Sequence, residues 1–377
     1  MAPKIINLCI ITLLLFSCSI DKEPVLTEDV SDTVDQNSIA ENALYFPPIS
    51  SSAWETVSPE ELNFQSSEEQ NLYNFLEEND SDAFMILKDG KIVVEWYFRD
   101  FTQTDNHTWN SAGKTLTAMT VGIAQFEGFL DIEESSKTYL GEGWSSMTPG
   151  KEDAITVKNH LTMTTGLDYN RSGSFSNDDF FCTDSPCLTF RNEPDSFWFY
   201  HNAPYTILDE VITRSTEMDF TAYFYEKIRD RIGMQGAWVN VGYNNLYFSN
   251  TRSMARFGLL VLNHGTWEDT PILSDEVYFE AMTNSSQNLN PAYGYLWWLN
   301  GKSSYRVPGS EESFEGTIIP NAPDDMIAAL GANDQKLYVI PSKNMVILRF
   351  GDDASGGNFA SSGFDNTLWE RINAYIN

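Results

Sequence analysis

The 377-residue chain has little positive charge: 23 Lys and Arg residues stand against 54 Asp and Glu, which gives a formal net charge of −31. A surface of this charge repels nucleic-acid phosphates, so no nucleic-acid partner is expected. Hydrophobic residues nevertheless make up 42% of the chain and aromatic residues 14%. A chain of this length and composition can bury a large core, which excludes wholesale disorder.

Cysteine and histidine are also scarce, and their spacing argues against several kinds of site. The four cysteines include no Cys-x-x-Cys pair, which argues against a thiolate zinc site. The four histidines are scattered, and no His-Glu-x-x-His motif occurs. A Ser-His-Asp hydrolase would want a Gly-x-Ser-x-Gly elbow, and the chain has none. We therefore expect a site that uses no metal and no other cofactor.

The first residues predict an export signal. Lys4 precedes an almost unbroken apolar run, Ile5 to Phe16, which is too short to span a bilayer as a helix but suits a signal-peptide core. The run ends in Leu15-Phe16-Ser17-Cys18, which resembles the bacterial lipobox, where the cysteine is lipidated and becomes the new N-terminus. The alternative is an ordinary secretory signal with an incidental cysteine. Because Cys18 lies where the apolar run stops, we predict a lipoprotein signal peptide over residues 1–17 and a lipid anchor at Cys18.

Composition shifts after Cys18. Residues 19–45 contain seven acidic residues, one lysine and few large apolar side chains, which predicts an acidic flexible tether over residues 18–50. The folded domain is then expected over residues 51–377, in the bacterial cell envelope, either periplasmic or at the outer-membrane surface. In that compartment Cys182 and Cys187, which flank a turn-prone Thr-Asp-Ser-Pro loop, can form a disulfide. Two free thiols are the alternative.

The two ends of the domain predict strands with flanking helices, and the middle predicts helices. Phe84 to Phe98 contains two β-rich runs joined by Asp89-Gly90, a strong hairpin signal. Further β-like runs lie between Met326 and Phe350, and helical spacing marks Pro59–Glu78 and Asn366–Ile376. The predicted fold is α+β. Its antiparallel sheet comes from about 55–110 and 300–377 and is flanked by terminal helices, and an all-helical region of about 111–299 is inserted.

One candidate nucleophile opens the best helical pattern in the chain. Ser111 lies at or near the helix start, and Lys114 follows three residues later, so both side chains share one helix face. A serine needs a base within hydrogen-bond reach, and a lysine can serve if burial lowers its pKa. The bare pattern is weak, because it recurs at Ser19 to Lys22 in the tether. Taken alone, Ser111 reads better as a helix N-cap.

A tyrosine elsewhere in the chain complements this pair. Tyr200 stands just before a predicted helix, with Asn202 two residues later, and could present its phenol to Ser111 and Lys114. This pattern also recurs, at Tyr243 to Asn245, and a buried core tyrosine is the alternative for Tyr200. Trp297 and Trp298 allow two interpretations as well: a wall of the cleft, or part of the core.

Together, Ser111-x-x-Lys114 and Tyr200-x-Asn202 resemble the motifs of class C serine β-lactamases and the related penicillin-binding proteins and esterases. Three further segments are similar to that family: 156–167, 254–262 and 293–298. The resemblance covers roughly residues 70–377 and implies a β-lactamase/transpeptidase-like fold. It also implies Ser111 as acylated nucleophile, Lys114 as general base and Tyr200 as proton shuttle, with Asn202 bound to the lysine or to the substrate amide. The oxyanion hole would combine the Ser111 N–H with one from the facing strand, around Gly331 and Ala332.

One departure from the family concerns that facing strand. The family usually carries Lys-Thr-Gly or His-x-Gly there, whereas this chain reads Ala-Leu-Gly at residues 329–331. In β-lactamases and carboxypeptidases the cation helps hold the substrate carboxylate. Its absence favours an ester or amide that lacks this carboxylate, on a scaffold similar to that of 6-aminohexanoate-dimer hydrolases.

The leading interpretation is therefore a serine hydrolase of the esterase or amidase kind. A D,D-peptidase or β-lactamase is the runner-up, and a catalytically silent binding protein with the same fold is the alternative from a different class. The expected partners are a small ester, amide or peptide substrate and the membrane, reached through the anchor at Cys18.

Overall fold

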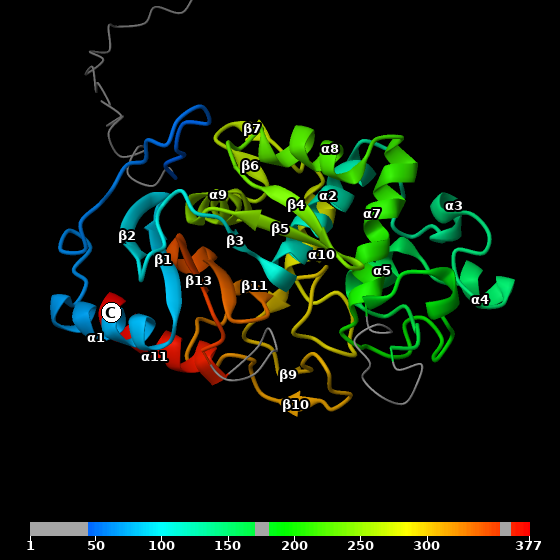
Figure 1. The fold of residues 1–377 in the computed structure, drawn as a ribbon. Coiled ribbons are helices and arrows are strands. Elements are labelled where there is room, and N and C mark those ends of the chain that lie inside the picture. Colours follow the sequence, from blue (N-terminus) through cyan, green and yellow to red (C-terminus); the bar gives the residue numbers. More distant parts are fainter. Residues whose placement is uncertain (1–43, 170–180, 355–362) are drawn as a thin grey trace, which may run out of the picture. The chain divides into compact units, whose positions relative to one another are not determined.

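A computed structural model describes residues 44–169, 181–354 and 363–377 (Figure 1). The predicted signal peptide, Cys18 and the predicted tether up to residue 43 lie outside these ranges. In the part of the chain that is described, no helix has both the length and the apolar character needed to cross a bilayer.

A six-stranded antiparallel sheet, in the order β2-β1-β13-β12-β11-β8, forms the framework on which the site is built. Its strands are β1 (Ser81–Lys88), β2 (Lys91–Tyr97), β8 (Trp298–Leu299), β11 (Ile327–Gly331), β12 (Gln335–Ile340) and β13 (Met345–Gly351), with the short turn η4 (Pro341–Lys343) before the last. The predicted hairpin at Asp89-Gly90 is confirmed. Both residues have positive φ, as a two-residue type I′ turn requires.

Two terminal helices pack together against one face of this sheet (Figure 1). They are α1 (Ser66–Glu78) and α11 (Gly363–Ile376), whose Phe75 and Phe364 rings stack with centroids 5.6 Å apart. The prediction that the first helix starts at Pro59 is wrong. The Pro59 carbonyl instead accepts the N–H groups of Leu62 and Phe64, which closes separate turns before α1.

The opposite face of the sheet is covered by α9 (Thr251–Leu262). Gly258 makes the close approach possible: a Cβ at this position would lie 2.5 Å from Val346 Cγ1 and 2.9 Å from Leu337 Cδ1. Both of those side chains belong to the sheet, in β13 and β12. The helix therefore packs its backbone directly onto the sheet surface.

The inserted region is mainly helical, and the predicted fold class is confirmed. Its helices and helical turns are η1 (Asn110–Gly113), α2 (Lys114–Phe126), α3 (Lys137–Leu140), α4 (Pro149–Asp153), α5 (Val157–Thr162), η2 (Ser185–Cys187), α7 (Asn202–Thr216), α8 (Phe220–Phe224), η3 (Tyr225–Arg229), α9 and α10 (Glu276–Thr283). Helix α2 lies between the sheet and α7 (Figure 1). It is buried at every position from Lys114 to Ala124, including its polar residues Lys114, Thr115, Thr117 and Thr120.

The expectation that this region is all-helical is wrong. The strands β4 (Ala237–Val241) and β5 (Asn244–Ser249) pair with β3 (His107–Thr108) in a small sheet, because Gly242, at φ +61°, turns the chain back on itself. Two short strand pairs complete the described structure: β6 (Thr266–Trp267) with β7 (Thr270–Pro271), and β9 (Ser304–Tyr305) with β10 (Phe314–Glu315).

Residues 44–50, which the sequence places in the tether, pack against the domain. The Arg256 guanidinium of α9 donates hydrogen bonds to the carbonyls of Pro47, Pro48 and Ser51, and the Tyr45 N–H donates to the Asp89 carbonyl at the β1–β2 turn. The packed chain therefore extends at least to residue 44.

The contact of α9 with the sheet gives a stability prediction. Gly258→Ala should lower the free energy of unfolding by about 1–3 kcal/mol, because the new methyl group overpacks the contact with Val346 and this outweighs the better helix propensity of alanine. Urea denaturation followed by circular dichroism measures the change. The matched control is Gly150→Ala in α4, where a Cβ meets no atom within 4 Å. Equal shifts in the two variants would contradict the packing argument.

Candidate active site

The structure brings the first two candidate residues into contact. Ser111 lies in η1, and Lys114 is the first residue of α2. The Lys114 Nζ and Ser111 Oγ atoms are 3.0 Å apart, within hydrogen-bond distance. A general base must reach the proton that it removes at about this distance. The pair can therefore transfer a proton without rearrangement of the backbone.

Burial makes Lys114 suitable as a base. Only 2% of the residue is exposed, and this burial lowers the pKa of its amine well below the usual 10.5. Among the residues that the structure describes, no carboxylate forms an ion pair with Lys114 and none raises its pKa. The charged form thus loses its hydration without gaining a counter-ion, and the neutral amine is favoured.

Tyr200 lies on the other side of the same pair. Its ring centroid is 5.0 Å from Lys114 Nζ, and its buried hydroxyl makes no hydrogen bond within the described residues. Burial raises the pKa of Tyr200 above its usual range, and the interaction with the Ser111 hydroxyl offsets part of that rise. Tyr200 is therefore a neutral phenol at physiological pH. It can pass a proton on, but it is not a standing phenolate base.

Stacked aromatic rings hold Tyr200 in this position. The Trp298 ring stacks on Tyr200 with centroids 5.7 Å apart, and Tyr293 meets both rings edge to face. Trp297 stacks instead on Phe257 of α9. Both tryptophans are almost completely buried, so the core interpretation of Trp297 and Trp298 is confirmed. Trp298 supports the site from behind and is not an open wall of the cleft.

The end of β11 lies directly against the turn that carries Ser111. A Cβ on Gly331 would lie 2.3 Å from the Trp109 carbonyl oxygen and 3.2 Å from the Ala112 nitrogen, so only glycine fits there. Ala332 follows immediately, and its carbonyl accepts a hydrogen bond of 2.8 Å from Asn110 Nδ2. The two segments assigned to the oxyanion hole are thus neighbours joined by a side-chain hydrogen bond.

Asn202 is the first residue of α7, which packs against both α2 and α5. Its side-chain oxygen Oδ1 is buried and has no hydrogen-bond partner within the described ranges. A buried acceptor of this kind is costly unless a donor reaches it. An unpaired acceptor at Asn202 is consistent with the two partners that the family resemblance implies, Lys114 or a substrate amide.

Two residues of the site escaped the sequence analysis. Asn110 adopts the left-handed conformation at φ +47°, which asparagine tolerates better than most residues, so the residue type next to Ser111 was an available signal. Tyr205 places its ring centroid 4.0 Å from Lys114 Nζ, closer than Tyr200 does. No sequence pattern marked Tyr205, because this contact depends on how α7 packs against α2.

The strand that lacks the family cation is β11, and it carries no other cation on the side of the cleft. Ala329 stands where the family carries Lys or His, pairs with Leu337 and is fully buried. Lys336 and Arg349, the cations of the neighbouring strands, are paired with each other in register on the opposite face. There the Lys336 amine is 2.8 Å from Asp365 of α11 and 3.1 Å from Asp334. These cations are committed to a buried ion cluster behind the sheet.

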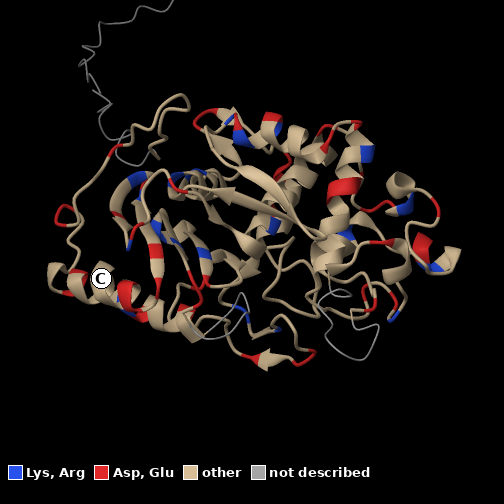
Figure 2. Cartoon of the chain, viewed as in Figure 1, with Lys and Arg blue, Asp and Glu red and all other residues tan. Residues whose placement is uncertain are grey.

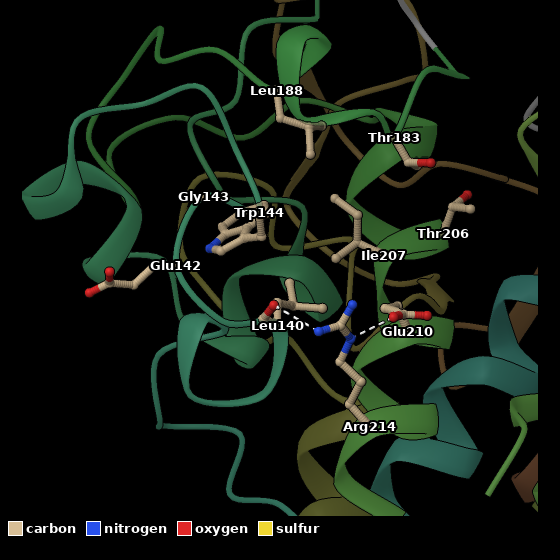
Figure 3. A pocket seen from close by; sticks show the side chains of 10 residues that line it. All are labelled: Leu140, Glu142, Gly143, Trp144, Thr183, Leu188, Thr206, Ile207, Glu210 and Arg214. Atoms are coloured by element: carbon tan, nitrogen blue, oxygen red, sulfur yellow. Dashed lines mark hydrogen bonds and ion pairs between the residues drawn. The ribbon is translucent and has the colours of Figure 1, made fainter. Parts of the chain in front are cut away.

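The predicted disulfide between Cys182 and Cys187 is confirmed. Thr183 of its loop lines a pocket of about 530 Å³, together with Leu140, Glu142, Gly143, Trp144, Leu188, Thr206, Ile207, Glu210 and Arg214 (Figure 3). Arg214 donates to Glu210 and to the Leu140 carbonyl across it. Neither Ser111 nor Lys114 lines this pocket. The residues of α7 that line it are therefore different from those that lie near Ser111 and Lys114.

Comparisons with known proteins agree with this geometry. The family model described as Beta-lactamase matches residues 74–351, so the chain belongs to the Beta-lactamase family. A 6-aminohexanoate-dimer hydrolase from Paenarthrobacter ureafaciens is 23% identical over 321 residues, 73% of each chain. A Bacillus anthracis structure provisionally assigned as a 6-aminohexanoate-dimer hydrolase superposes with a TM-score of 0.65 at 20% identity, over 88% of this chain and 89% of that one. A family VIII carboxylesterase gives 0.60 at 16% identity, over 83% and 98%.

The hydrogen bond from Asn110 to Ala332 gives a prediction about the site. Asn110→Gly keeps the left-handed backbone but removes the link to β11, so the oxyanion donors should lose their alignment. We expect the rate of labelling of Ser111 by a fluorophosphonate, followed by intact-protein mass, to fall by at least about tenfold. The control is Asn63→Gly, an exposed left-handed asparagine remote from the site in sequence. Equal labelling rates in the two variants would show that the link does not matter.

Proposed function

We propose that this protein is a serine hydrolase that forms an acyl-enzyme at Ser111 and acts on an uncharged ester or amide. The observation that carries the proposal is the 3.0 Å contact between Ser111 Oγ and the amine of Lys114, whose pKa is lowered well below its usual value by burial. Membership of the Beta-lactamase family supports it, because Ser111 and Lys114 lie within the residues that the family model matches and resemble the family motif.

In this proposal, Lys114 removes the hydroxyl proton as Ser111 Oγ attacks the carbonyl carbon of the substrate. The negative charge that develops on the carbonyl oxygen is held by the backbone N–H groups of Ser111 and Ala332. The Tyr200 phenol then relays the proton from Lys114 to the leaving alcohol or amine, which departs as the acyl-enzyme forms. A water molecule hydrolyses the acyl-enzyme by the reverse use of the same groups, and Ser111 is regenerated.

The preference for an uncharged substrate rests on electrostatics. Ala329 replaces the cation that helps bind the substrate carboxylate in β-lactamases and carboxypeptidases, and Lys336 and Arg349 are held behind the sheet. The net charge of −31 adds a repulsive field for anions, and Figure 2 shows acidic residues spread over both the sheet and the helical parts. A substrate carboxylate would lose hydration in the site without meeting a cation from β11 or from its neighbouring strands.

We further propose that the protein works in the bacterial cell envelope, held to a membrane by a lipid on Cys18. The sequence of residues 1–18 supports this placement. A disulfide between Cys182 and Cys187 is consistent with it, because disulfides persist in oxidising compartments outside the cytoplasm. Mass analysis of the mature N-terminus, purified from membranes, tests the anchor directly.

The nucleophile assignment is tested by chemistry that needs no known substrate. Treatment with a fluorophosphonate should add one adduct mass to the wild-type protein and none to Ser111→Ala, and Lys114→Met should be labelled far more slowly because Ser111 loses its base. The melting temperature of Ser111→Ala should stay near that of wild type, since one hydroxyl at a cleft contributes little to stability. Absence of an adduct on the folded wild-type protein would favour a catalytically silent binding protein.

The charge preference is tested with a matched pair of esters. We expect kcat/KM for 4-nitrophenyl butyrate to exceed that for 4-nitrophenyl hemisuccinate by at least about tenfold, because the two differ mainly by a terminal methyl group against a carboxylate. The cephalosporin nitrocefin, which carries a carboxylate, serves as the third substrate. Faster turnover of the hemisuccinate or of nitrocefin would instead support a D,D-peptidase or β-lactamase.

A further inference from the structure

A second aromatic ring contacts the lysine of the site, and the proposed mechanism does not yet use it. Tyr205, in the first turn of α7, is almost fully buried, and its ring centroid is 4.0 Å from Lys114 Nζ. This is within the distance over which an aromatic face attracts a cation. The Lys114 amine thus lies between Ser111 and two tyrosine rings.

An aromatic ring attracts the charged form of a lysine, and Lys114 must change its charge during the proposed reaction. Before acylation the base has to be neutral, and a neutral amine gains little from an aromatic face. When Lys114 takes the Ser111 proton it becomes an ammonium in a site where burial opposes the charge. A carboxylate partner would relieve that cost but would also keep Lys114 protonated beforehand. An aromatic ring stabilises the ammonium more weakly and leaves the resting amine neutral.

We propose, resting on the acylation mechanism above, that Tyr205 is a positioning residue that holds the Lys114 ammonium against its ring face while the proton is on the lysine. The ring is fixed at its far end. The Tyr205 hydroxyl donates to the Asn245 carbonyl at 3.3 Å, and Asn245 Nδ2 is 3.0 Å from Asp209 Oδ2, one turn further along α7. The small sheet therefore anchors the ring that faces the base.

The titratable groups around Lys114 are largely uncharged, so the aromatic ring of Tyr205 is left to stabilise the ammonium. Burial raises the pKa of Asp209 to about 8, so most of this acid is uncharged at pH 7 and provides little counter-charge. Other buried titratable groups packed around α2 and α7 include Tyr200, Tyr247, Tyr278 and His160. Burial raises the pKa of each of these phenols and lowers the pKa of His160 to about 4, so all four are neutral. The charged groups Glu127 and Lys227 at the end of α2 pair with each other, as do Glu210 and Arg214 on α7.

The test measures fluorophosphonate labelling of the whole chain as a function of pH, from about pH 5 to pH 10. In wild type the rate should rise with pH as Lys114 loses its proton, and the midpoint of this rise reports the pKa of Lys114. In Tyr205→Met the ammonium loses its aromatic partner, so the pKa of Lys114 falls and the rise should move to lower pH by about one unit. The plateau rate should fall by about three- to tenfold, because the ammonium forming in the transition state is less stable.

The matched control is Tyr205→Phe, which keeps the ring and loses only the hydrogen bond to Asn245. It should retain the wild-type midpoint and at least about half the wild-type plateau rate. A purely structural role for Tyr205 would lower the rate of Tyr205→Met at every pH and leave the midpoint unchanged, which would overturn the proposal. A midpoint that moved to higher pH would also overturn it, since that is the sign expected if water entered the site.

A second series covers the case in which Tyr205→Met does not fold. Phenylalanine with increasing numbers of ring fluorines at position 205 keeps the shape of the ring and weakens its attraction for a cation. The midpoint should then fall step by step with each fluorine, and an unchanged midpoint would overturn the proposal. Failure of the wild-type protein to label would instead contradict the acylation mechanism itself, so the two hypotheses are separated.

Discussion

Burial of the Lys114 amine without a carboxylate partner is the constraint on which the rest of the site depends. A charged amine in this position would lose its hydration, which lowers the pKa of Lys114 and favours the neutral form that can act as a base beside Ser111. That condition requires a helix buried on all sides, and α2 meets it with continuous burial from Lys114 to Ala124. Lys114 is therefore at the start of a deeply buried helix, where packing excludes water.

Contacts on both sides of α2 hold the sheet and the helical region in fixed positions relative to Ser111. On the sheet side, Gly331 lets β11 touch the backbone of η1, and Asn110 ties the two with a hydrogen bond to Ala332. On the helical side, Trp298 supports Tyr200, and the turn at Gly242 brings β5 beneath Tyr205. Each contact joins segments at least forty residues apart in the chain, so no single element positions the site alone.

A second buried lysine, which lies in the sheet, differs from Lys114 because it has carboxylate partners. Lys336 is as buried as Lys114, but it contacts Asp365 and Asp334, so its positive charge is compensated. Breaking such a cluster would leave a buried charge unpaired, which is strongly destabilising. The same residue type is thus a paired ion in the sheet and, at Lys114, an amine whose pKa is lowered by burial, because only Lys336 has carboxylate partners among the described residues.

The sequence by itself determined the parts of this protein that depend on local pattern. Period-two and helical spacing, together with Asp89-Gly90, predicted the hairpin, the C-terminal strands and most helices, and motif spacing selected Ser111, Lys114, Tyr200 and Asn202. Only the tertiary structure decided that β4 and β5 form a sheet within the helical region, that Asn110 holds Ala332, and that Tyr205 faces Lys114. The physical reason is that these features arise from packing between distant segments, and the spacing of residues along one segment carries no information about which ring or carbonyl another segment will bring to it.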